Sequence, residues 1–300
     1  MTLWAFFLIF CSVLLHASWH FICKSRNPHL GFFVVFSFAI LCSMLPLMLC
    51  SRIAVTAIPG IVWLCAAAGG VSGMICDIGL GYAYRTTDIS QAYPMARALP
   101  VLFTAFATEL FGIGKPLSPL ALAAMGVIFL GCVLLPLPDW RNFRLNTYCS
   151  RGMLGILLAA IGTTCYTIAD GYGVPQLAKA FPECPSLLAA GCYSFWREAA
   201  AFCALMFGVR FLPGERAYFT RGVWRQVQPY LAGFFAGSAY VLVLCAMKFV
   251  TNVSYVQAFR QISLPIGVLL GVIFLKERLN RQKLLAILLI LGGLAAVSLR

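Results

Sequence analysis

Two arginines lie within long apolar stretches of this chain, and their side chains are the ones best suited to hold an acidic group. Arg97 and Arg260 are each followed within five residues by a proline and then by a further apolar run. A guanidinium donates two parallel hydrogen bonds to a carboxylate or a phosphate, and a charge at membrane depth costs roughly 3 kcal/mol or more. The arginines therefore predict a central anion-binding site. The alternative is a structural role, with Arg97 paired to Glu109, Asp77 or a backbone carbonyl.

Four segments place further polar residues at helical spacing, so that each segment has one polar face. These residues are Ser12, His16, Trp19, His20 and Cys23; Ser90, Tyr93, Arg97, Thr104 and Thr108; Thr163, Tyr166, Thr167, Asp170 and Gly173; and Gln257, Arg260, Ser263, Gly267 and Gly271. Polar stripes that face lipid are costly, so the four faces predict a shared, water-accessible cavity. We expect Trp19, Tyr93, Tyr166, Gln257 and Ser263 to complete a substrate-binding site around the two arginines.

Three titratable side chains on these faces are candidates for proton coupling. Asp170 lies near the expected end of its helix, where it is either a helix-end carboxylate or a partner of an arginine or of His16. His16 and His20, with a reference pKa of about 6.5, either bind protons or act as hydrogen-bonded structural groups. Arg197 and Glu198 are adjacent and point to different faces of a helix, which favours a structural ion pair with another helix.

No metal, cofactor or catalytic signature accompanies these residues in the sequence. The spacing of His16 and His20 lacks the His-Glu-x-x-His context of a catalytic zinc helix, and the thirteen cysteines form no Cys-x-x-Cys pair. Nucleophile-elbow and nucleotide-loop motifs are missing as well. We therefore expect neither a cofactor nor an enzyme activity.

The composition indicates a polytopic membrane protein. Of the 300 residues, 62% are hydrophobic and only 10% are charged, and the mean hydropathy is +0.91. Soluble domains are about a quarter charged. Segments that are long and apolar enough to span a bilayer are 3–22, 30–51, 60–83, 88–111, 119–137, 152–173, 187–211, 229–249, 252–275 and 282–299. They leave no room for a soluble domain.

The net charge of +13 does not indicate a nucleic-acid partner, because the basic residues gather at the ends of the apolar segments. Most of them lie in the connections after the first, third, fifth, seventh and ninth segments. By the positive-inside rule these connections are cytoplasmic, which places both termini outside. We expect basic clusters such as those in 210–225 and 276–283 to contact lipid headgroups.

The two halves of the chain show a weak similarity that keeps its order. The segments that match are 83–85 with 246–248, 91–93 with 257–259, and 115–118 with 277–280. Each half holds five apolar segments, an odd number, so the second half is expected to be inverted across the membrane. We therefore expect an all-α polytopic membrane protein with ten transmembrane helices in two inverted five-helix repeats, 1–138 and 152–300, joined by a cytoplasmic linker at 139–151.

At these residues the chain resembles the drug/metabolite transporter superfamily, in its ten-helix EamA-like branch. Leu15-His16-Ala17-Ser18-Trp19-His20 is similar to a His-Ala-x-Trp-Asn signature in the first helix of one bacterial subgroup, with His20 in place of the asparagine. Further similar segments are 83–85, 88–90, 93–97, 170–173, 260–263 and 274–279. The resemblance implies transport of small polar metabolites across the bacterial inner membrane. The first segment lacks the glutamate of the small multidrug members, which disfavours export of cationic drugs.

Three hypotheses follow from the sequence. The first is a secondary transporter of a small anionic or zwitterionic metabolite, working by alternating access with proton coupling, exchange or facilitated diffusion. The second is a flippase for a phosphorylated lipid-linked headgroup, and the third, which no motif supports, is a membrane-embedded enzyme. We expect the partners to be a small polar metabolite and the lipid bilayer, with no nucleic acid, and the protein to be a monomer or a homodimer.

Overall fold

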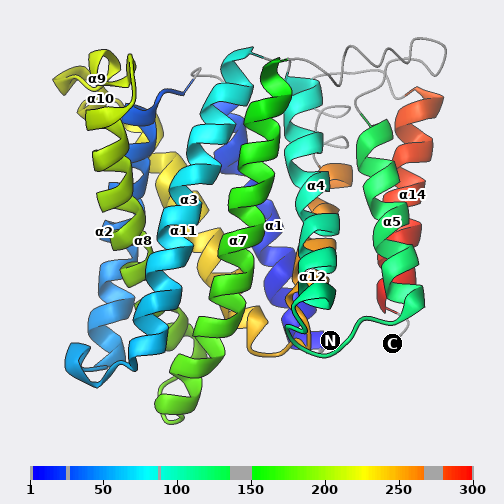
Figure 1. Cartoon of the computed structure of the whole chain (residues 1–300), viewed down its shortest axis with the longest axis horizontal. Coiled ribbons are helices and arrows are strands. Elements are labelled where there is room, and N and C mark those ends of the chain that lie inside the picture. Colours follow the sequence, from blue (N-terminus) through cyan, green and yellow to red (C-terminus); the bar gives the residue numbers. More distant parts are fainter. Residues whose placement is uncertain (1–2, 25–27, 87–88, 136–150, 267–279, 299–300) are drawn as a thin grey trace.

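The computed structural model is all-helical over the residues that it describes, which are 3–24, 28–86, 89–135, 151–266 and 280–298. No β-strand occurs in these ranges, so the expectation of an all-α protein is confirmed for them. Figure 1 shows the helices side by side as one bundle, with the first turn of α1 and the last turn of α14 at the same end.

The helices begin and end close to the predicted apolar segments. In the first half they are α1 (Leu3–Lys24), α2 (Leu30–Ser51), α3 (Gly60–Thr86), α4 (Ile89–Leu110) and α5 (Pro119–Leu134), with a 3-10 turn η1 (Val55–Ala57). In the second half they are α7 (Arg151–Ala180), α8 (Ser186–Phe211), α9 (Glu215–Tyr218), α10 (Arg221–Trp224), α11 (Val227–Met247), α12 (Val253–Phe259), a 3-10 turn η3 (Arg260–Ile262) and α14 (Arg281–Ser298). Local signals set some ends: the Ser118 hydroxyl caps α5, and Pro119 opens it.

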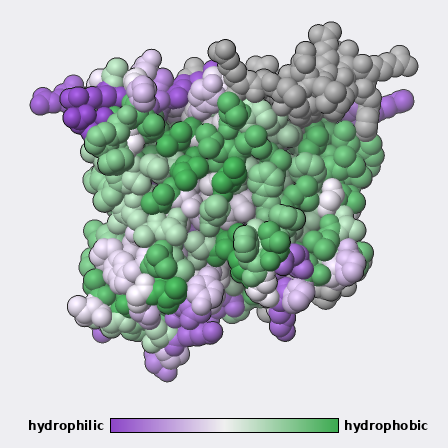
Figure 2. Space-filling model, in the orientation of Figure 1, coloured by the Kyte–Doolittle hydropathy of each residue, from purple (hydrophilic) through white to green (hydrophobic). Residues whose placement is uncertain are grey.

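Several helices have the length and composition needed to cross a bilayer. Among the described residues, five such helices include the spans Leu3–His20, Leu30–Ser51, Gly60–Thr86, Gly152–Ala180 and Val227–Met247. Figure 2 shows a broad band of hydrophobic side chains on the visible face, with hydrophilic residues at both ends of the bundle. These features are those of a multi-pass membrane protein.

The most extensive contact between two helices is that of α3 with α7, and small residues allow the backbones of these two helices to touch. A methyl group added to Gly162 of α7 would lie 2.6 Å from the Ser72 carbonyl oxygen of α3, and one added to Gly155 would lie 2.7 Å from the Gly79 carbonyl oxygen. The next most extensive pairs are α1 with α11, α2 with α8, and α5 with α14. Packing between the two halves therefore holds the bundle together.

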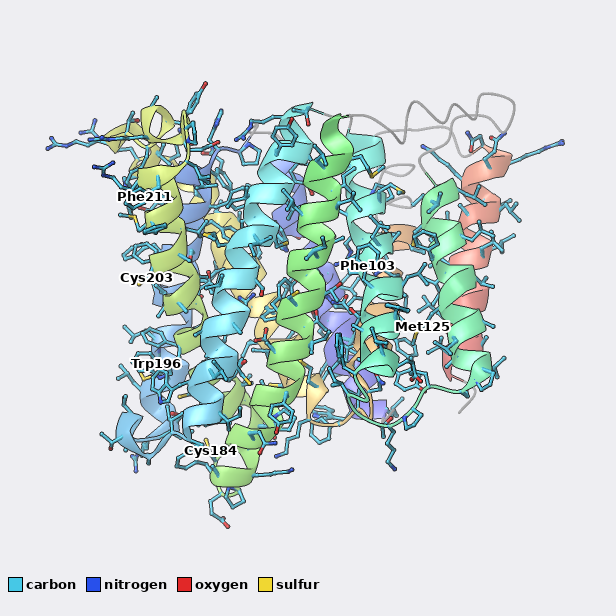
Figure 3. All side chains as sticks on the ribbon, viewed as in Figure 1. Phe103, Met125, Cys184, Trp196, Cys203 and Phe211 are labelled. Carbon is cyan, nitrogen blue, oxygen red and sulfur yellow. The ribbon has the colours of Figure 1, made fainter. Side chains whose placement is uncertain are left out.

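The helices α5 and α14 also pack closely through glycines, and each of the two helices contributes one. A methyl group on Gly131 of α5 would meet the Ala286 carbonyl oxygen, and one on Gly293 of α14 would meet the Ala124 carbonyl oxygen. Met125 of α5 is fully buried, and Figure 3 shows it on the side of α5 that faces α4. Cys203 and Phe211 of α8, by contrast, are exposed and extend from the outer face of the bundle in Figure 3.

The structure corrects the predicted position of Asp170. The predicted apolar segment ends at residue 173, but α7 continues without a break to Ala180. Gly173 instead provides space, since an added methyl group would lie 2.7 Å from the Tyr193 ring of α8. Asp170 is consequently an internal, fully buried residue and not a helix-end carboxylate.

The predicted segment 252–275 is interrupted near its start. The helix α12 ends at Phe259, and the chain continues through the 3-10 turn η3, which begins with Arg260, before residues 263–266 return to α-helix. The later part of this segment, 267–275, lies outside the described residues, as does the predicted linker, except for Arg151, which begins α7. The break places Arg260 where the regular helical hydrogen-bond ladder changes.

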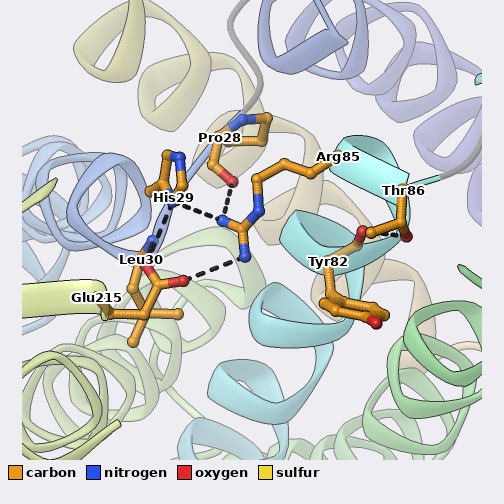
Figure 4. Close-up of polar contacts among 7 residues, drawn as sticks. All are labelled: Pro28, His29, Leu30, Tyr82, Arg85, Thr86 and Glu215. Carbon is orange, nitrogen blue, oxygen red and sulfur yellow. Dashed lines mark hydrogen bonds and ion pairs between the residues drawn. The ribbon is translucent and has the colours of Figure 1, made fainter. Parts of the chain in front are cut away.

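A polar cluster joins α2, α3 and α9 at the end of the bundle opposite the first turn of α1 (Figures 1 and 4). The Glu215 carboxylate accepts hydrogen bonds from the Leu30 backbone N–H, at 2.8 Å, and from the Arg85 guanidinium, at 3.1 Å. Arg85 also donates to the Pro28 carbonyl oxygen and to His29 Nδ1, both at 2.9 Å. Glu215 therefore supplies the negative charge that the N-terminus of α2 favours.

The close contact between α3 and α7 predicts a position-specific effect of alanine. Gly162→Ala forces its methyl group against the backbone of α3 and should lower the free energy of unfolding by about 1–3 kcal/mol. Gly126→Ala in α5 is the matched control, because an added methyl group there meets nothing within 4 Å. Unfolding titrations in detergent micelles measure both variants. Equal stability of the two variants would contradict the packing described for α3 and α7.

The cluster at Glu215 predicts that protonation of His29 makes the stability of the protein depend on pH. Burial and the nearby Arg85 guanidinium lower the pKa of His29 below its usual value near 6.5. The unfolded chain therefore takes up this proton first as the pH falls, so His29 contributes a loss of stability below about pH 6.5. The difference in melting temperature between pH 7.5 and pH 5.5 should be smaller in His29→Gln than in the wild type. An unchanged difference would show that His29 does not contribute.

Candidate binding cavity

A cavity of about 110 Å³ lies between the two halves of the chain, with lining residues from α1, α2, α3, α4, α7, α8, α11, α12 and η3. This volume is enough for several water molecules or a small polar ligand. Its charged lining residues are Asp77, Arg97, Arg197, Glu198 and Arg260. The shared cavity expected from the polar helix faces is therefore present.

Arg97 connects α4 to the interrupted helical region around η3. Its guanidinium donates to the Arg260 carbonyl oxygen at 2.6 Å and to the Ser263 hydroxyl at 2.8 Å. The Gln261 amide returns a hydrogen bond of 2.9 Å to the Arg97 carbonyl oxygen. Arg97 therefore combines a position on the cavity wall with a structural role between α4 and η3.

The polar face of α1 forms a chain of rings beside Arg97. The Trp19 indole N–H donates to His16 Nδ1 at 2.9 Å, and Arg97 Nη1 lies 2.6 Å from His16 Nε2. His20 lies 3.1 Å from His16 through their Nε2 atoms and 3.0 Å from the Tyr84 hydroxyl through Nδ1. Trp19 also stacks on His20, with 3.6 Å between ring centroids. These contacts fix both histidines in place within the wall of the cavity.

Arg197 of α8 is the centre of a buried ion-pair cluster. Its Nε lies 3.2 Å from Asp170 Oδ2 of α7, and its Nη1 lies 3.1 Å from Glu198 Oε2. The guanidinium also lies over the rings of Tyr166 and Tyr240, at 4.9 and 4.8 Å from their centroids. The predicted ion pair between Arg197 and another helix is thus the one with Asp170.

Hydrogen bonds satisfy both carboxylates of this cluster. Asp170, which is 0% exposed, accepts from the hydroxyls of Tyr193, at 2.8 Å, and Tyr240, at 2.5 Å. Glu198 accepts from the Ser37 hydroxyl at 2.5 Å. Buried carboxylates are tolerated when they are paired and hydrogen-bonded in this way.

Two glycines of α3 leave the space that the cluster occupies. A methyl group on Gly69 would collide with the Asp170 carboxylate, and one on Gly73 would lie 3.0 Å from Arg197 Nη2. Gly69 and Gly73, which lie four residues apart in α3, therefore serve charge burial as well as helix packing.

Arg260 differs from Arg197 in its partners. Its side chain is only 4% exposed and lines the cavity, yet it forms no ion pair or hydrogen bond with any residue that the structure describes. The ring of Tyr240, at 5.9 Å from centroid to guanidinium, is its one cation–π contact within this part of the chain. A buried guanidinium without a counter-charge is suited to receive an acidic group from a ligand.

The structure brings most of the predicted site residues together. His16, Trp19, His20, Arg97, Tyr166, Gln257 and Arg260 line the cavity. Ser263 lies behind Arg97, and Asp170 lies behind Arg197. Gln257 is held by a hydrogen bond from its amide to Thr167. The side chain of Tyr93 lies outside the described part of the structure.

Sequence reasoning missed several residues of the cavity wall. Tyr240 of α11 contacts Asp170, Arg197 and Arg260, but no spacing signal distinguished it from other tyrosines. Asp77 was noted as a partner for Arg97 and not as a ligand-binding residue. The available signal was its position in α3, four residues after Gly73 and four before Gly81, because a lone acid among small residues faces a neighbouring helix or a cavity.

The fold has a counterpart among solved structures. One that is described as "Crystal structure of protein" is similar over 98% of this chain and 96% of its own, with a TM-score of 0.69 and 19% sequence identity. No protein-family model and no curated protein matches the chain. The likeness establishes the shared fold.

The ion-pair cluster predicts unequal costs for its members. Asp170→Asn leaves Arg197 with one carboxylate and should lower the free energy of unfolding by about 3–5 kcal/mol. Tyr193→Phe removes one hydrogen bond to the same carboxylate and should cost about 1 kcal/mol. Unfolding titrations in detergent rank the two variants. If Tyr193→Phe proved as costly as Asp170→Asn, the ion pair would not be the main interaction.

Proposed function

We propose that this protein is a secondary active transporter that moves a small anionic or zwitterionic metabolite across the membrane by alternating access. The single observation that carries the proposal is Arg260, a buried guanidinium that lines the cavity and has no counter-charge among the described residues. Such a charge is costly at membrane depth and is typically retained for function. Arg97, Trp19, Tyr166 and Gln257 complete the wall around it.

The pattern of helix contacts supports an arrangement of ten transmembrane helices as two inverted repeats. Exchanging α1, α2, α3 and α5 with α7, α8, α11 and α14, respectively, converts the contact of α3 with α7 into that of α11 with α1, and both contacts are extensive. The same exchange relates α3 with α8 to α11 with α2, and it leaves the pairs α2 with α8 and α5 with α14 unchanged. Inverted repeats around a central site are typical of alternating-access transporters.

The distribution of basic residues supports an orientation with both termini outside. Arg216, Arg221 and Arg225 lie in or next to α9 and α10, which are at the opposite end of the bundle from the first turn of α1 and the last turn of α14 (Figure 1). By the positive-inside rule that end faces the cytoplasm. We place the protein in the bacterial inner membrane on the same grounds and on its resemblance to EamA-like transporters.

Proton coupling through Asp170, His16 or His20 remains part of the proposal. The contacts of these residues determine how coupling would work. The hydrogen bonds from Tyr193 and Tyr240 and the ion pair with Arg197 stabilise the ionised form of Asp170, so loss of these contacts would favour uptake of a proton. We therefore propose that proton exchange at Asp170 accompanies a change of conformation that separates these groups. No chemical conversion of the substrate is proposed.

The proposal predicts that binding of acidic metabolites depends on Arg260. Purified protein should be stabilised by a subset of small carboxylates, phosphonates or amino acids, because a ligand at about 100 times its Kd adds about 2.7 kcal/mol to stability. Arg260→Gln should weaken this binding at least tenfold, whereas Arg210→Gln, a change at an exposed arginine of α8, should not. Melting temperatures in detergent and uptake into proteoliposomes measure the effect. Stabilisation by cations alone, or unchanged binding in a folded Arg260→Gln variant, would contradict the proposal.

A further inference from the structure

A second charged group in the cavity also lacks a hydrogen-bond or ion-pair partner among the residues that the structure describes. Asp77 of α3 lines the cavity and is partly accessible, and it forms no hydrogen bond or ion pair with any described residue. We propose that Asp77 binds the cationic group of a small zwitterionic substrate whose anionic group binds Arg260. The inference rests on the proposed transport function and narrows its substrate class.

The carboxylates of the other acidic residues at the cavity already have hydrogen-bond and ion-pair partners. Asp170 is held by Arg197 and two tyrosine hydroxyls, and Glu198 is held by Arg197 and Ser37. A ligand cation would have to displace these contacts to reach either carboxylate. Asp77 requires no such displacement, so it is the carboxylate that a substrate ammonium group can approach directly.

Asp77 and Arg260 are also separate from each other. No ion pair of 4.0 Å or less joins them, although both side chains line the same cavity. Among the described residues, Arg197 and Glu198 of α8 act electrostatically on Asp77, and these two are paired with each other. The wall thus presents an available negative charge and an available positive charge to the same cavity.

The charge balance of the site favours a ligand with no net charge. The described residues at the cavity and directly behind it include three arginines, Arg97, Arg197 and Arg260, and three acids, Asp77, Asp170 and Glu198. When all six are ionised, these charges cancel. A zwitterion preserves the balance, whereas a monoanion would leave an uncompensated negative charge in a medium of low dielectric constant.

The size of the cavity restricts the ligand further. A volume of about 110 Å³ admits a compound of few heavy atoms without rearrangement of the walls. The class that fits is a small molecule with one ammonium group and one carboxylate, sulfonate or phosphonate group. Arg260 can bind any of these three acid groups, because a guanidinium donates paired hydrogen bonds to each of them.

A panel of matched compounds tests the inference. Each small zwitterion with a carboxylate, sulfonate or phosphonate group is compared with the analogue that lacks the amine and with the amine that lacks the acid. Thermal shifts in detergent give apparent affinities for wild type, Asp77→Asn, Arg260→Gln and the control Glu183→Gln, whose site is exposed in the loop between α7 and α8. Competition for uptake in proteoliposomes checks the ranking.

The inference predicts that wild type binds at least one zwitterion ten times more tightly than either analogue. Asp77→Asn should lose that preference while it still binds the deaminated acid, Arg260→Gln should lose both, and Glu183→Gln should lose neither. Deaminated acids that bind wild type as tightly as the zwitterions, through Arg260, would overturn the inference and leave the proposed function intact. Binding that is indifferent to Arg260→Gln, or a panel without any binder, would overturn both.

Discussion

The architecture of the cavity depends on the need to compensate charge inside the bundle. Arg197 meets this need for two acids at once, since Asp170 and Glu198 both lie within ion-pair distance of its guanidinium. The cluster joins α7 to α8, and Gly69 and Gly73 let α3 approach it. Because an unpaired buried charge is far more costly than a paired one, this cluster fixes the relative positions of three helices that line the site.

Because Arg197 is held by its two carboxylate partners, Arg260 and Asp77 are the charges in the cavity that can bind a ligand. Arg260 begins the 3-10 turn that interrupts its helical segment, and Asp77 lies on the glycine-rich face of α3. Helix interruptions near the middle of a bundle are where transporters bind their substrates. Because the described part of the chain offers no counter-charge to Arg260 or Asp77, these two residues are informative about the charges of the ligand.

Much of the fold could be predicted from the sequence, and parts of the site could not. The limits of α2 agree with the apolar segment 30–51 because hydrophobic length is a direct physical requirement. Arg97 and Arg260, the two arginines that the sequence singled out, both line the cavity, and a hydrogen bond joins the Arg97 guanidinium to the Arg260 carbonyl oxygen. The internal position of Asp170 and the role of Tyr240 depend on how helices rotate and pack, which periodicity alone does not determine.

The central claim is that this cavity opens alternately to the two sides of the membrane. Ser194 of α8 lines it and is almost fully buried, so a single cysteine at this position, in a variant whose native cysteines are replaced, reports access to the site. In oriented membrane vesicles a membrane-impermeant maleimide should label Ser194→Cys from either face, and a bound substrate should slow the labelling. Labelling from one face alone, with or without substrate, would contradict alternating access.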